Sequence, residues 1–221
     1  MQKGVALHMN WHLSDNWDFK SITAYRKLDT AAYIDIDASP MQLGDVLVDL
    51  HQHQLSQEFQ LQYNNHDNLH AVFGLYYLNE HVPSHQEAYA DSFLTFFGLP
   101  INFLRTIDDN LINKSYAAFG NATWALGDGW SLSAGLRYTD EKKDYFRTTS
   151  TFYGAPFQAA NGTFAFTDSK SWSAVTPSLA LQKQINPQLM WYASANRGFK
   201  SGGFNGRANS PADVSAFNPE F

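Results

Sequence analysis

The sequence of 221 residues contains no cysteine, little charge and no long hydrophobic run. Without cysteine, neither a disulfide bond nor a cysteine-ligated metal site can form. Charged residues make up only 16% of the chain, and the 15 Lys and Arg are outnumbered by 21 Asp and Glu, which gives a formal net charge of −6. The basic residues form no stripe that would neutralise phosphates, so we expect no nucleic-acid partner.

Membrane helices and a leader sequence are missing as well. No stretch offers the roughly 18 consecutive apolar residues that a spanning helix requires, which excludes a helical membrane protein. Residues 1–10 contain no basic start followed by an apolar stretch and a cleavage site, so no signal peptide is visible. We therefore expect either a protein that stays inside the cell or a chain whose front is missing.

What the sequence does contain is a period of two. Apolar and polar residues alternate strictly over 130–138, and the alternation over 55–63 is interrupted only by Gln57. Such alternation is typical of a β-strand with one apolar and one polar face. Weaker alternation recurs in six further stretches: 3–12, 17–27, 69–79, 114–126, 171–183 and 188–198. The pattern predicts eight strands of about nine to fourteen residues each.

One of these stretches cannot be oriented from the sequence. In 114–126, Tyr116 and Trp124 share one parity, whereas Phe119 has the other. The face of this strand therefore stays unassigned.

The predicted lengths and connections indicate a membrane-spanning sheet. Strands of soluble proteins usually have about five or six residues, whereas tilted strands that cross a bilayer need about 9–11. Short turns at 14–16, 64–68, 127–129 and 186–188 alternate with long connections at about 29–52, 80–113, 145–170 and from 199 onward. Short periplasmic turns, long extracellular loops and a tryptophan girdle beside the turns are typical of a transmembrane β-barrel.

We therefore predict an all-β fold, an antiparallel transmembrane β-barrel portion of about eight long strands in four hairpins. Two alternatives remain open. Eight strands suffice to close a small barrel, so the chain is also compatible with an autonomous structural outer-membrane barrel. A soluble carbohydrate-binding β-sandwich would explain the aromatic residues as a core or as sugar-stacking surfaces.

Several segments resemble the β-barrel of TonB-dependent outer-membrane receptors. The resemblance lies in 114–124 and 132–143, with further matches at 21–26, 56–61, 176–181 and 192–205. It implies a receptor in the outer membrane of a Gram-negative bacterium that takes up a scarce nutrient, most of all a ferric siderophore or other iron complex. It also implies energy from the TonB complex, which contacts a plug domain.

The resemblance implies that residues 1–221 are a partial barrel domain, with the plug domain and the C-terminal strands absent. Barrels of this transporter class have about 22 strands around a plugged lumen. The partners that we expect are an iron–siderophore or similar small ligand, outer-membrane lipid, and TonB through the missing plug region.

Ligand contacts are expected from aromatic and charged residues of the long connections, because rings stack on a bulky chelate and Arg or Lys pairs with its anionic groups. Packing of loop against loop would explain the same residues equally well. The candidates are Tyr89, Phe93, Phe96, Phe97, Arg105, Tyr153, Phe157, Lys200, Phe204, Asn205 and Arg207.

Metal and enzyme chemistry find little support. His51 and His53 lie two apart and would share a strand face, but spacing fixes no third ligand, so they are weak metal candidates. The glycine-dense stretch 198–207 lacks the context of a phosphate-binding loop, and no Gly-x-Ser-x-Gly pattern occurs. We expect no cofactor, no resident metal and no enzymatic activity.

Overall fold

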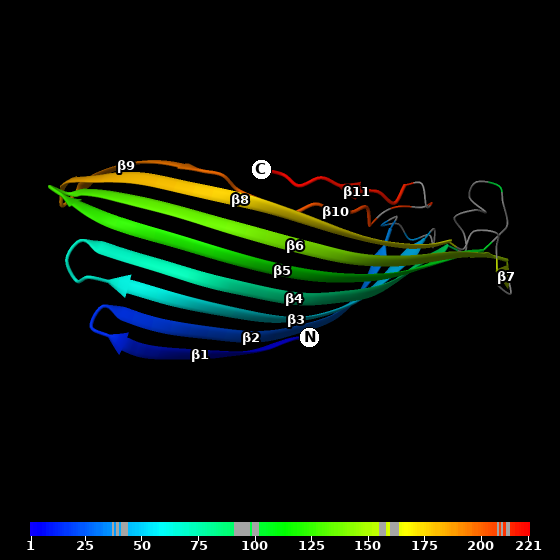
Figure 1. Ribbon diagram of the computed structural model, residues 1–221. Helices are drawn as coiled ribbons and strands as arrows, with labels where there is room; N and C mark the ends of the chain where they lie inside the picture. Colours follow the sequence, from blue (N-terminus) through cyan, green and yellow to red (C-terminus); the bar gives the residue numbers. More distant parts are fainter. Residues whose placement is uncertain are drawn as a thin grey trace.

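Antiparallel strands account for nearly all of the regular structure (Figure 1). The computed structural model describes residues 1–36, 38, 40, 44–90, 98, 102–154, 158–159, 164–206, 208, 210 and 213–221. Its strands are β1 (Gln2–Ser14), β2 (Trp17–Asp35), β3 (Asp45–Asn64), β4 (Leu69–Ala90), β5 (Phe103–Gly127), β6 (Trp130–Tyr153), β7 (Gln158–Ala159), β8 (Phe164–Asn186), β9 (Leu189–Asn196), β10 (Gly203–Phe204) and β11 (Ala216–Phe217). These described residues contain no helix long and apolar enough to cross a membrane.

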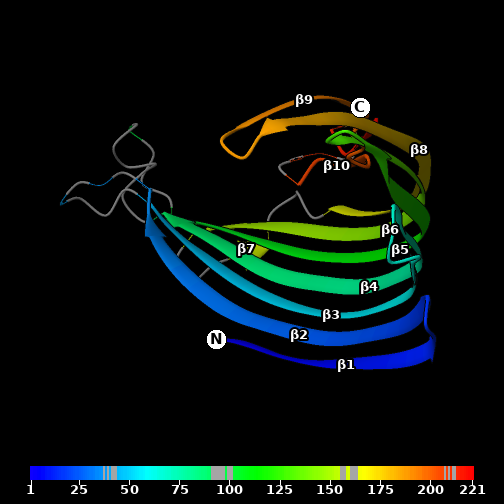
Figure 2. The same cartoon turned by 90° about the vertical axis from the view of Figure 1, so that its left-hand side faces the viewer.

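The strands form one curved sheet in the order β1-β2-β3-β4-β5-β6-β8-β9, with β7 paired to the end of β6. The sheet curls into an open trough, and β10 lies inside its curve (Figure 2). Within the described part of the chain, the edge strands β1 and β9 do not pair with each other, so the eight long strands do not close into a small barrel. A single curved sheet also rules out the two-layered sandwich.

All four short turns occur where the sequence predicts them. Gly127, Asp128 and Gly129 each have a positive φ, which glycine adopts without steric cost. In the turn between β3 and β4, Asn65 Oδ1 accepts hydrogen bonds from the backbone N–H groups of Asn68 at 3.0 Å and Leu69 at 2.9 Å. These local contacts fix the hairpins and hence the register of the sheet.

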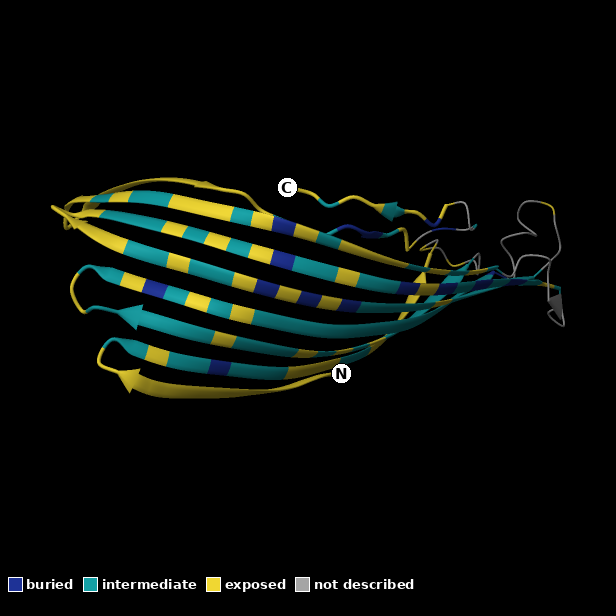
Figure 3. Cartoon of the chain, viewed as in Figure 1, coloured by how far each residue is buried: buried dark blue, intermediate teal, exposed yellow. Residues whose placement is uncertain are grey.

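The register places the apolar residues of neighbouring strands in common rows. Trp11 lies opposite Phe19, Phe19 opposite Leu61, and Leu61 opposite Phe73. This row belongs to the convex face, where large apolar side chains stay exposed; Leu75, for example, is 59% exposed. Figure 3 shows how exposed positions recur along the long strands. An apolar face without a covering layer matches a surface that meets lipid.

The apolar face covers only part of each strand. Counted from the short turns, the continuous apolar band ends at Tyr25, Leu55, Tyr77, Tyr116 and Tyr138, because the next outward residue on each strand is polar. We call the part between the short turns and these residues the lower half of the sheet, and the remainder the upper half. The lower half spans about nine residues of each strand, which is the length that a tilted strand needs to cross a bilayer.

The upper half corrects the sequence analysis. Strands β2 to β6 and β8 have 19 to 25 residues rather than nine to fourteen. Most of the expected connections 29–52, 80–113 and 145–170 therefore continue the strands as extensions above the apolar band. Both faces of these extensions mix polar and apolar residues, so the alternation that reveals a strand in the sequence fades there.

The unassigned stretch 114–126 now has a clear orientation. Tyr116 and Trp124 lie on the convex face, and Phe119 points to the concave face opposite Gly74 of β4. A Cβ atom added at Gly74 would lie 2.2 Å from the Phe119 ring, so glycine is required for this ring to lie across its neighbour. The aromatic ring in turn covers the backbone that glycine leaves bare.

The interruption at Gln57 is also explained. Its side chain faces outward in the lower half, where Thr23 Oγ1 donates to Gln57 Oε1 at 2.5 Å and Gln57 Nε2 donates to Ser21 Oγ at 2.9 Å. Ser21 and Thr23 lie on the neighbouring strand β2 and satisfy the amide locally. An amide with its hydrogen bonds satisfied is much less costly beside lipid than an unpaired one.

Candidate functional site

The concave face holds a segment from the last part of the chain, the described residues 197–206, 208, 210 and 213–221, which we call the inner segment. Its strands β10 and β11 pair with each other rather than with the large sheet. The Phe204 ring stacks on Tyr145 of β6 at 5.2 Å between ring centroids, and it also contacts Phe166 at 6.3 Å and Trp172 at 6.4 Å. Ala208 and Val214 complete this small core.

Polar contacts hold the inner segment at a second point. Lys143 Nζ donates to Ser201 Oγ at 2.7 Å and to the Gly202 carbonyl at 2.8 Å, while it pairs with Glu141 at 3.1 Å. Glu141 also accepts a hydrogen bond from the Ser201 hydroxyl. Because the Lys143 and Glu141 side chains are only 17% and 16% exposed, this ion pair is shielded from solvent screening.

A third contact is centred on Arg147, whose side chain is 1% exposed. Its Nη1 donates to the Gly206 carbonyl at 2.8 Å and lies 3.3 Å from Asp109 Oδ1 and 3.1 Å from the Tyr145 hydroxyl. The Tyr145 hydroxyl itself donates to Asp109 Oδ1 at 2.5 Å. The network joins β5, β6 and the inner segment in one buried arrangement.

Burial dominates the titration of this network. It raises the pKa of Asp109 above its usual value, against the opposing effects of the Tyr145 hydrogen bond and the Arg147 charge. Burial, reinforced by the hydrogen bond to Asp109, raises the pKa of Tyr145 to about 12. Tyr145 therefore stays a hydrogen-bond donor throughout the physiological pH range.

Two of the predicted ligand contacts meet at the upper end of the concave face. Arg105 of β5 and Tyr153 of β6 both lie beside Phe103, with the Arg105 guanidinium 5.6 Å from the centre of the Phe103 ring. The Phe103 and Tyr153 rings are 5.8 Å apart, and Arg105 Nε donates to Thr151 Oγ1 at 3.3 Å. The structure therefore brings a cation and two rings together, on strands rather than in the loops that the sequence indicates.

The other described candidates are dispersed. Tyr89 lies on β4 opposite Asp45 and Leu104, on the convex face. Within the inner segment, Lys200 pairs with Glu220 at 3.3 Å, Phe204 belongs to the core around Tyr145, and Asn205 Nδ2 donates to the Asp213 carbonyl at 3.2 Å. The remaining candidates lie outside the described residues: Phe93, Phe96, Phe97, Phe157 and Arg207.

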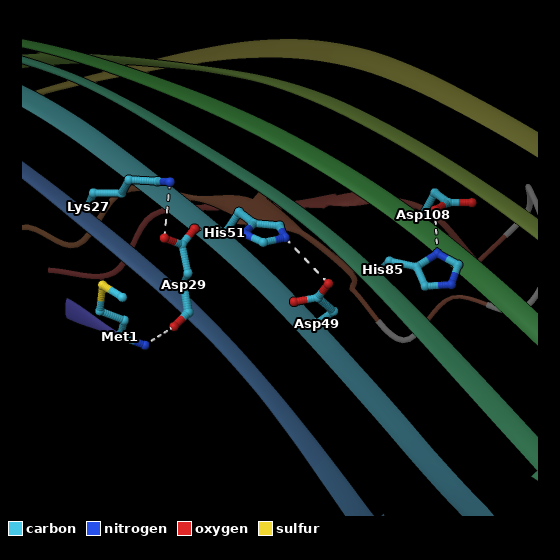
Figure 4. Close-up of polar contacts among 7 residues, drawn as sticks. All are labelled: Met1, Lys27, Asp29, Asp49, His51, His85 and Asp108. Carbon is cyan, nitrogen blue, oxygen red and sulfur yellow. Dashed lines mark hydrogen bonds and ion pairs between the residues drawn. The ribbon is translucent and has the colours of Figure 1, made fainter. Parts of the chain in front are cut away.

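The two weak metal candidates share the convex face of the upper half on β3. Figure 4 shows His51 beside Asp49. His51 Nδ1 lies 2.7 Å from Asp29 and its Nε2 lies 3.4 Å from Asp49, so both ring nitrogens face carboxylates. The His53 ring instead packs edge-on against His81, with 4.9 Å between centroids. In the part of the chain that the structure describes, no three His, Asp or Glu residues are arranged to hold a metal ion.

These histidine contacts shift the titration of both partners. The hydrogen bond with Asp29 is the main cause that raises the pKa of His51, and the same contact lowers the pKa of Asp29. His85 repeats the arrangement, with Nδ1 2.6 Å from Asp108 and Nε2 3.2 Å from Glu87, and these contacts raise its pKa. The convex face of the upper half thus carries exposed ion pairs where the lower half carries apolar side chains.

Sequence reasoning missed the residues that fasten the inner segment. Asp109, Tyr145 and Arg147 lie within stretches that were expected to be loops, and Asp109 is 38 residues from Arg147. A signal was present, since Tyr145 and Arg147 continue the parity of the concave residues of β6. Continuing that parity above the apolar band would have placed both residues on the inner wall.

Known proteins resemble this chain along almost its whole length. A family model described as TonB dependent receptor-like, beta-barrel matches residues 2–221. Among solved structures, the ferric yersiniabactin uptake receptor FyuA from Yersinia pestis superposes with a TM-score of 0.78 at 17% sequence identity, over 99% of this chain and 31% of that one. At this identity the likeness shows the fold, and the chain spans about a third of that receptor's length.

More distant similarities are weak. The RagAB peptide transporter matches with a TM-score of 0.40 and 6% identity, over 82% of this chain and 25% of that one. The ferric enterobactin receptor from Pseudomonas aeruginosa matches with a TM-score of 0.23 and 11% identity, over 90% of this chain and 41% of that one. Neither likeness is close enough to carry an argument.

Proposed function

Because the chain belongs to the TonB dependent receptor-like β-barrel family, we propose that it forms part of the wall of a nutrient uptake receptor in a Gram-negative outer membrane. Members of this family are outer-membrane proteins that bind a ligand and interact with TonB. We propose that the nutrient is a ferric siderophore or another iron complex, and that transport, not catalysis, is the role of the receptor.

The observation that carries this proposal is the family match over 2–221 together with the superposition on a ferric siderophore receptor. The structure is consistent with the role in two respects. The convex face of the lower half is apolar and suits lipid, and the concave face is lined with polar groups, as in a barrel that encloses a pathway.

The upper end of the concave face suits ligand capture. Arg105 offers a guanidinium for the anionic oxygens of an iron chelate, while Phe103 and Tyr153 offer ring faces for stacking. We propose these three residues as contacts of the ligand at the mouth of the receptor. TonB and a plug domain would act through parts of the receptor other than this wall.

Uptake of radioactive iron by whole cells tests the proposal. A strain that lacks the gene is complemented with the intact receptor and supplied with ⁵⁵Fe bound to catecholate, hydroxamate or phenolate siderophores, or as haemin. We expect one of these complexes to be taken up only with the receptor present, and uptake to stop when a protonophore removes the energy for TonB. Equal uptake of every complex by the deletion and complemented strains would contradict the assignment to iron.

A variant connects uptake to this chain. Replacing Arg105 with glutamine should weaken binding of the transported complex by about tenfold, the cost of removing one charge-assisted contact. Arg26→Gln, on the concave face of β2, provides a control with the same loss of charge. Unchanged binding in the Arg105 variant would show that this residue does not contact the ligand. The proposed uptake function would stand.

A further inference from the structure

Two arginines from different parts of the chain line the same hollow on the concave face. Arg137 comes from β6, and Arg197 follows directly after β9. The hollow has a volume of about 490 Å³ and is lined by hydroxyl groups as well as by the two guanidinium-bearing side chains. A neighbouring hollow of about 270 Å³ shares Arg137 and Arg197.

Aromatic rings and short contacts hold both guanidinium groups in place. The Arg137 guanidinium lies 5.6 Å from the centre of the Tyr76 ring and 5.5 Å from that of Phe119, and its Nε donates to Thr139 Oγ1 at 3.1 Å. The Arg197 guanidinium lies 4.0 Å from the centre of the Phe221 ring. A guanidinium stacked on a ring keeps N–H groups in its own plane for an anion.

The charge of the hollow is uncompensated. Within the described ranges, no carboxylate lies within ion-pair distance of Arg137 or Arg197. Glu141 also lines the hollow, but it pairs with Lys143 and accepts from Ser201. Lys200, a further lining residue, pairs with Glu220. Two positive charges therefore remain without an opposite charge.

The hollow lies at the height of the apolar band, which bears on the role of its two positive charges. Arg137 lies between Leu136 and Tyr138, which face outward within the apolar band and are 57% and 48% exposed. An ionisable residue at the height of the bilayer faces the interior and commonly marks a pathway or an internal contact. The hydroxyls of Ser115, Thr139, Thr176 and Ser201 also line the hollow. Thr176 donates to the Arg137 carbonyl and Ser201 donates to Glu141, which leaves Ser115 and Thr139 as the hydroxyl donors for an anion.

We propose that Arg137 and Arg197 form an anion-binding site on the inner wall, which takes a carboxylate group. Two oxygens in one plane match the fork of a guanidinium, so a carboxylate would engage both side chains and the nearby hydroxyls. The carboxylate belongs either to a soluble molecule in the lumen or to an acidic side chain of a segment that fills the lumen. The proposal applies to either source of the carboxylate and does not depend on which nutrient the receptor carries.

Citrate is the probe for the soluble source. Binding of citrate to the intact receptor in detergent is measured by titration calorimetry for the wild type, Arg137→Gln, Arg197→Gln and the double variant. We expect each single change to weaken binding by about tenfold, and the double change to abolish it. Arg26→Gln, a concave-face arginine outside both hollows, should bind citrate as the wild type does.

Thermal unfolding without citrate tests the internal source. If an acidic side chain already occupies the site, the wild type will not bind citrate, and the double variant will unfold at a lower temperature than Arg26→Gln. Raising the salt concentration to about 0.5 M should then narrow the difference between wild type and double variant, because salt screens ion pairs. A double lysine variant, which keeps both charges, that unfolds as early as the double glutamine variant would show that only ring contacts were lost and would overturn the proposal.

Folding is checked by the heat-dependent mobility of each variant on gels. Arg137→Lys combined with Arg197→Lys keeps both charges and should retain part of the binding or stability that the glutamine variants lose. If the double glutamine variant matches Arg26→Gln in both citrate binding and thermal unfolding, the hollow is not an anion site.

Discussion

The lower and upper halves of the sheet share the same strands and the same register, yet they are stabilised differently. In the lower half the convex face carries Leu75, Leu136 and Leu179, each more than half exposed, so its stability depends on a surrounding apolar phase. In the upper half the same face carries histidine–carboxylate pairs that suit water. The comparison shows that one strand can lie in lipid along one part and in water along another, provided that its outward residues change from apolar to polar at a fixed height.

The concave faces differ as well. In the upper half they contact the inner segment through Arg147, Lys143 and the core around Tyr145. Lower on the wall, the start of the inner segment contributes Arg197 to the arginine hollow. Contacts between distant parts of the chain therefore concentrate above the apolar band.

The largest effect is expected at Arg147. Arg147→Met leaves Asp109 buried without its cation, which should cost about 3–5 kcal/mol of the stability of the upper half. Susceptibility of the inner segment to a protease, measured in the intact receptor, reports this loss. Adding Asp109→Asn removes the buried charge and should recover part of it, which a double-mutant cycle quantifies. A protease rate equal to that of the wild type would show that the network does not hold the segment.

The second-largest effect is expected when a charge placed in lipid is compared with the same charge placed in water. Leu75→Arg places a charge on the convex face of the lower half and should lower the free energy of unfolding in lipid vesicles by about 2–4 kcal/mol. Tyr33→Arg places the same charge on the convex face of the upper half and should change it by less than about 0.5 kcal/mol. Equal effects in guanidinium unfolding experiments would contradict the division into two halves.

The turn at the lower end provides a third test. Gly129 has φ +76°, and a Cβ atom there would lie 2.4 Å from the Gln184 carbonyl oxygen. Gly129→Ala should therefore cost about 2–3 kcal/mol, from backbone strain and the clash together. Gly127 has φ +87° with open space around it, so Gly127→Ala should cost only about 1 kcal/mol. Denaturant unfolding gives the free energy of unfolding of both variants. Equal losses would show that the contact with Gln184 adds nothing to the cost.

The smallest effect concerns the exposed pair of His51 and Asp29. Because folding raises the pKa of His51, its contribution is fully present below the unfolded value of 6.5 and is lost as pH rises through the raised pKa. The lowered pKa of Asp29 sets the acid limit, since the contribution is lost as pH falls through it. His51→Gln should therefore lower the thermal midpoint slightly near pH 6 and leave it unchanged at alkaline pH.

His8→Gln on β1 is the matched control for the histidine substitution. A difference between His51→Gln and the wild type that grows toward alkaline pH would have the wrong sign and would contradict the ion pair.

The lower half could be predicted from the sequence because its two faces meet different solvents. Residues 130–138 alternate strictly for this reason, and the turn at 127–129 requires residues that tolerate positive φ. The stretch 114–126 resisted prediction because Phe119 is an aromatic residue on the inner wall, accommodated by Gly74 on another strand. Only the register reveals that pairing.

The upper half could not be predicted in the same way, because both of its faces mix polar and apolar residues and the alternation is lost. His51 was correctly expected to share a face with His53, but its carboxylate partner Asp29 lies on the adjacent strand. Phe204 was a candidate for ligand contact, whereas its stacking on Tyr145 across 59 positions depends on how the inner segment folds back. Such long-range partners follow from three-dimensional pairing and leave no local pattern.

The upward continuation of β4, β5 and β6 has a practical consequence. Each strand runs on for about 13 to 15 residues beyond the top of the apolar band, which at about 3.3 Å per residue and a tilt of about 40° lifts the rim roughly 30–40 Å clear of the hydrocarbon. An epitope tag inserted at that rim would stand far from the lipid surface, where an antibody added to living cells could reach it and count receptors without breaking the envelope.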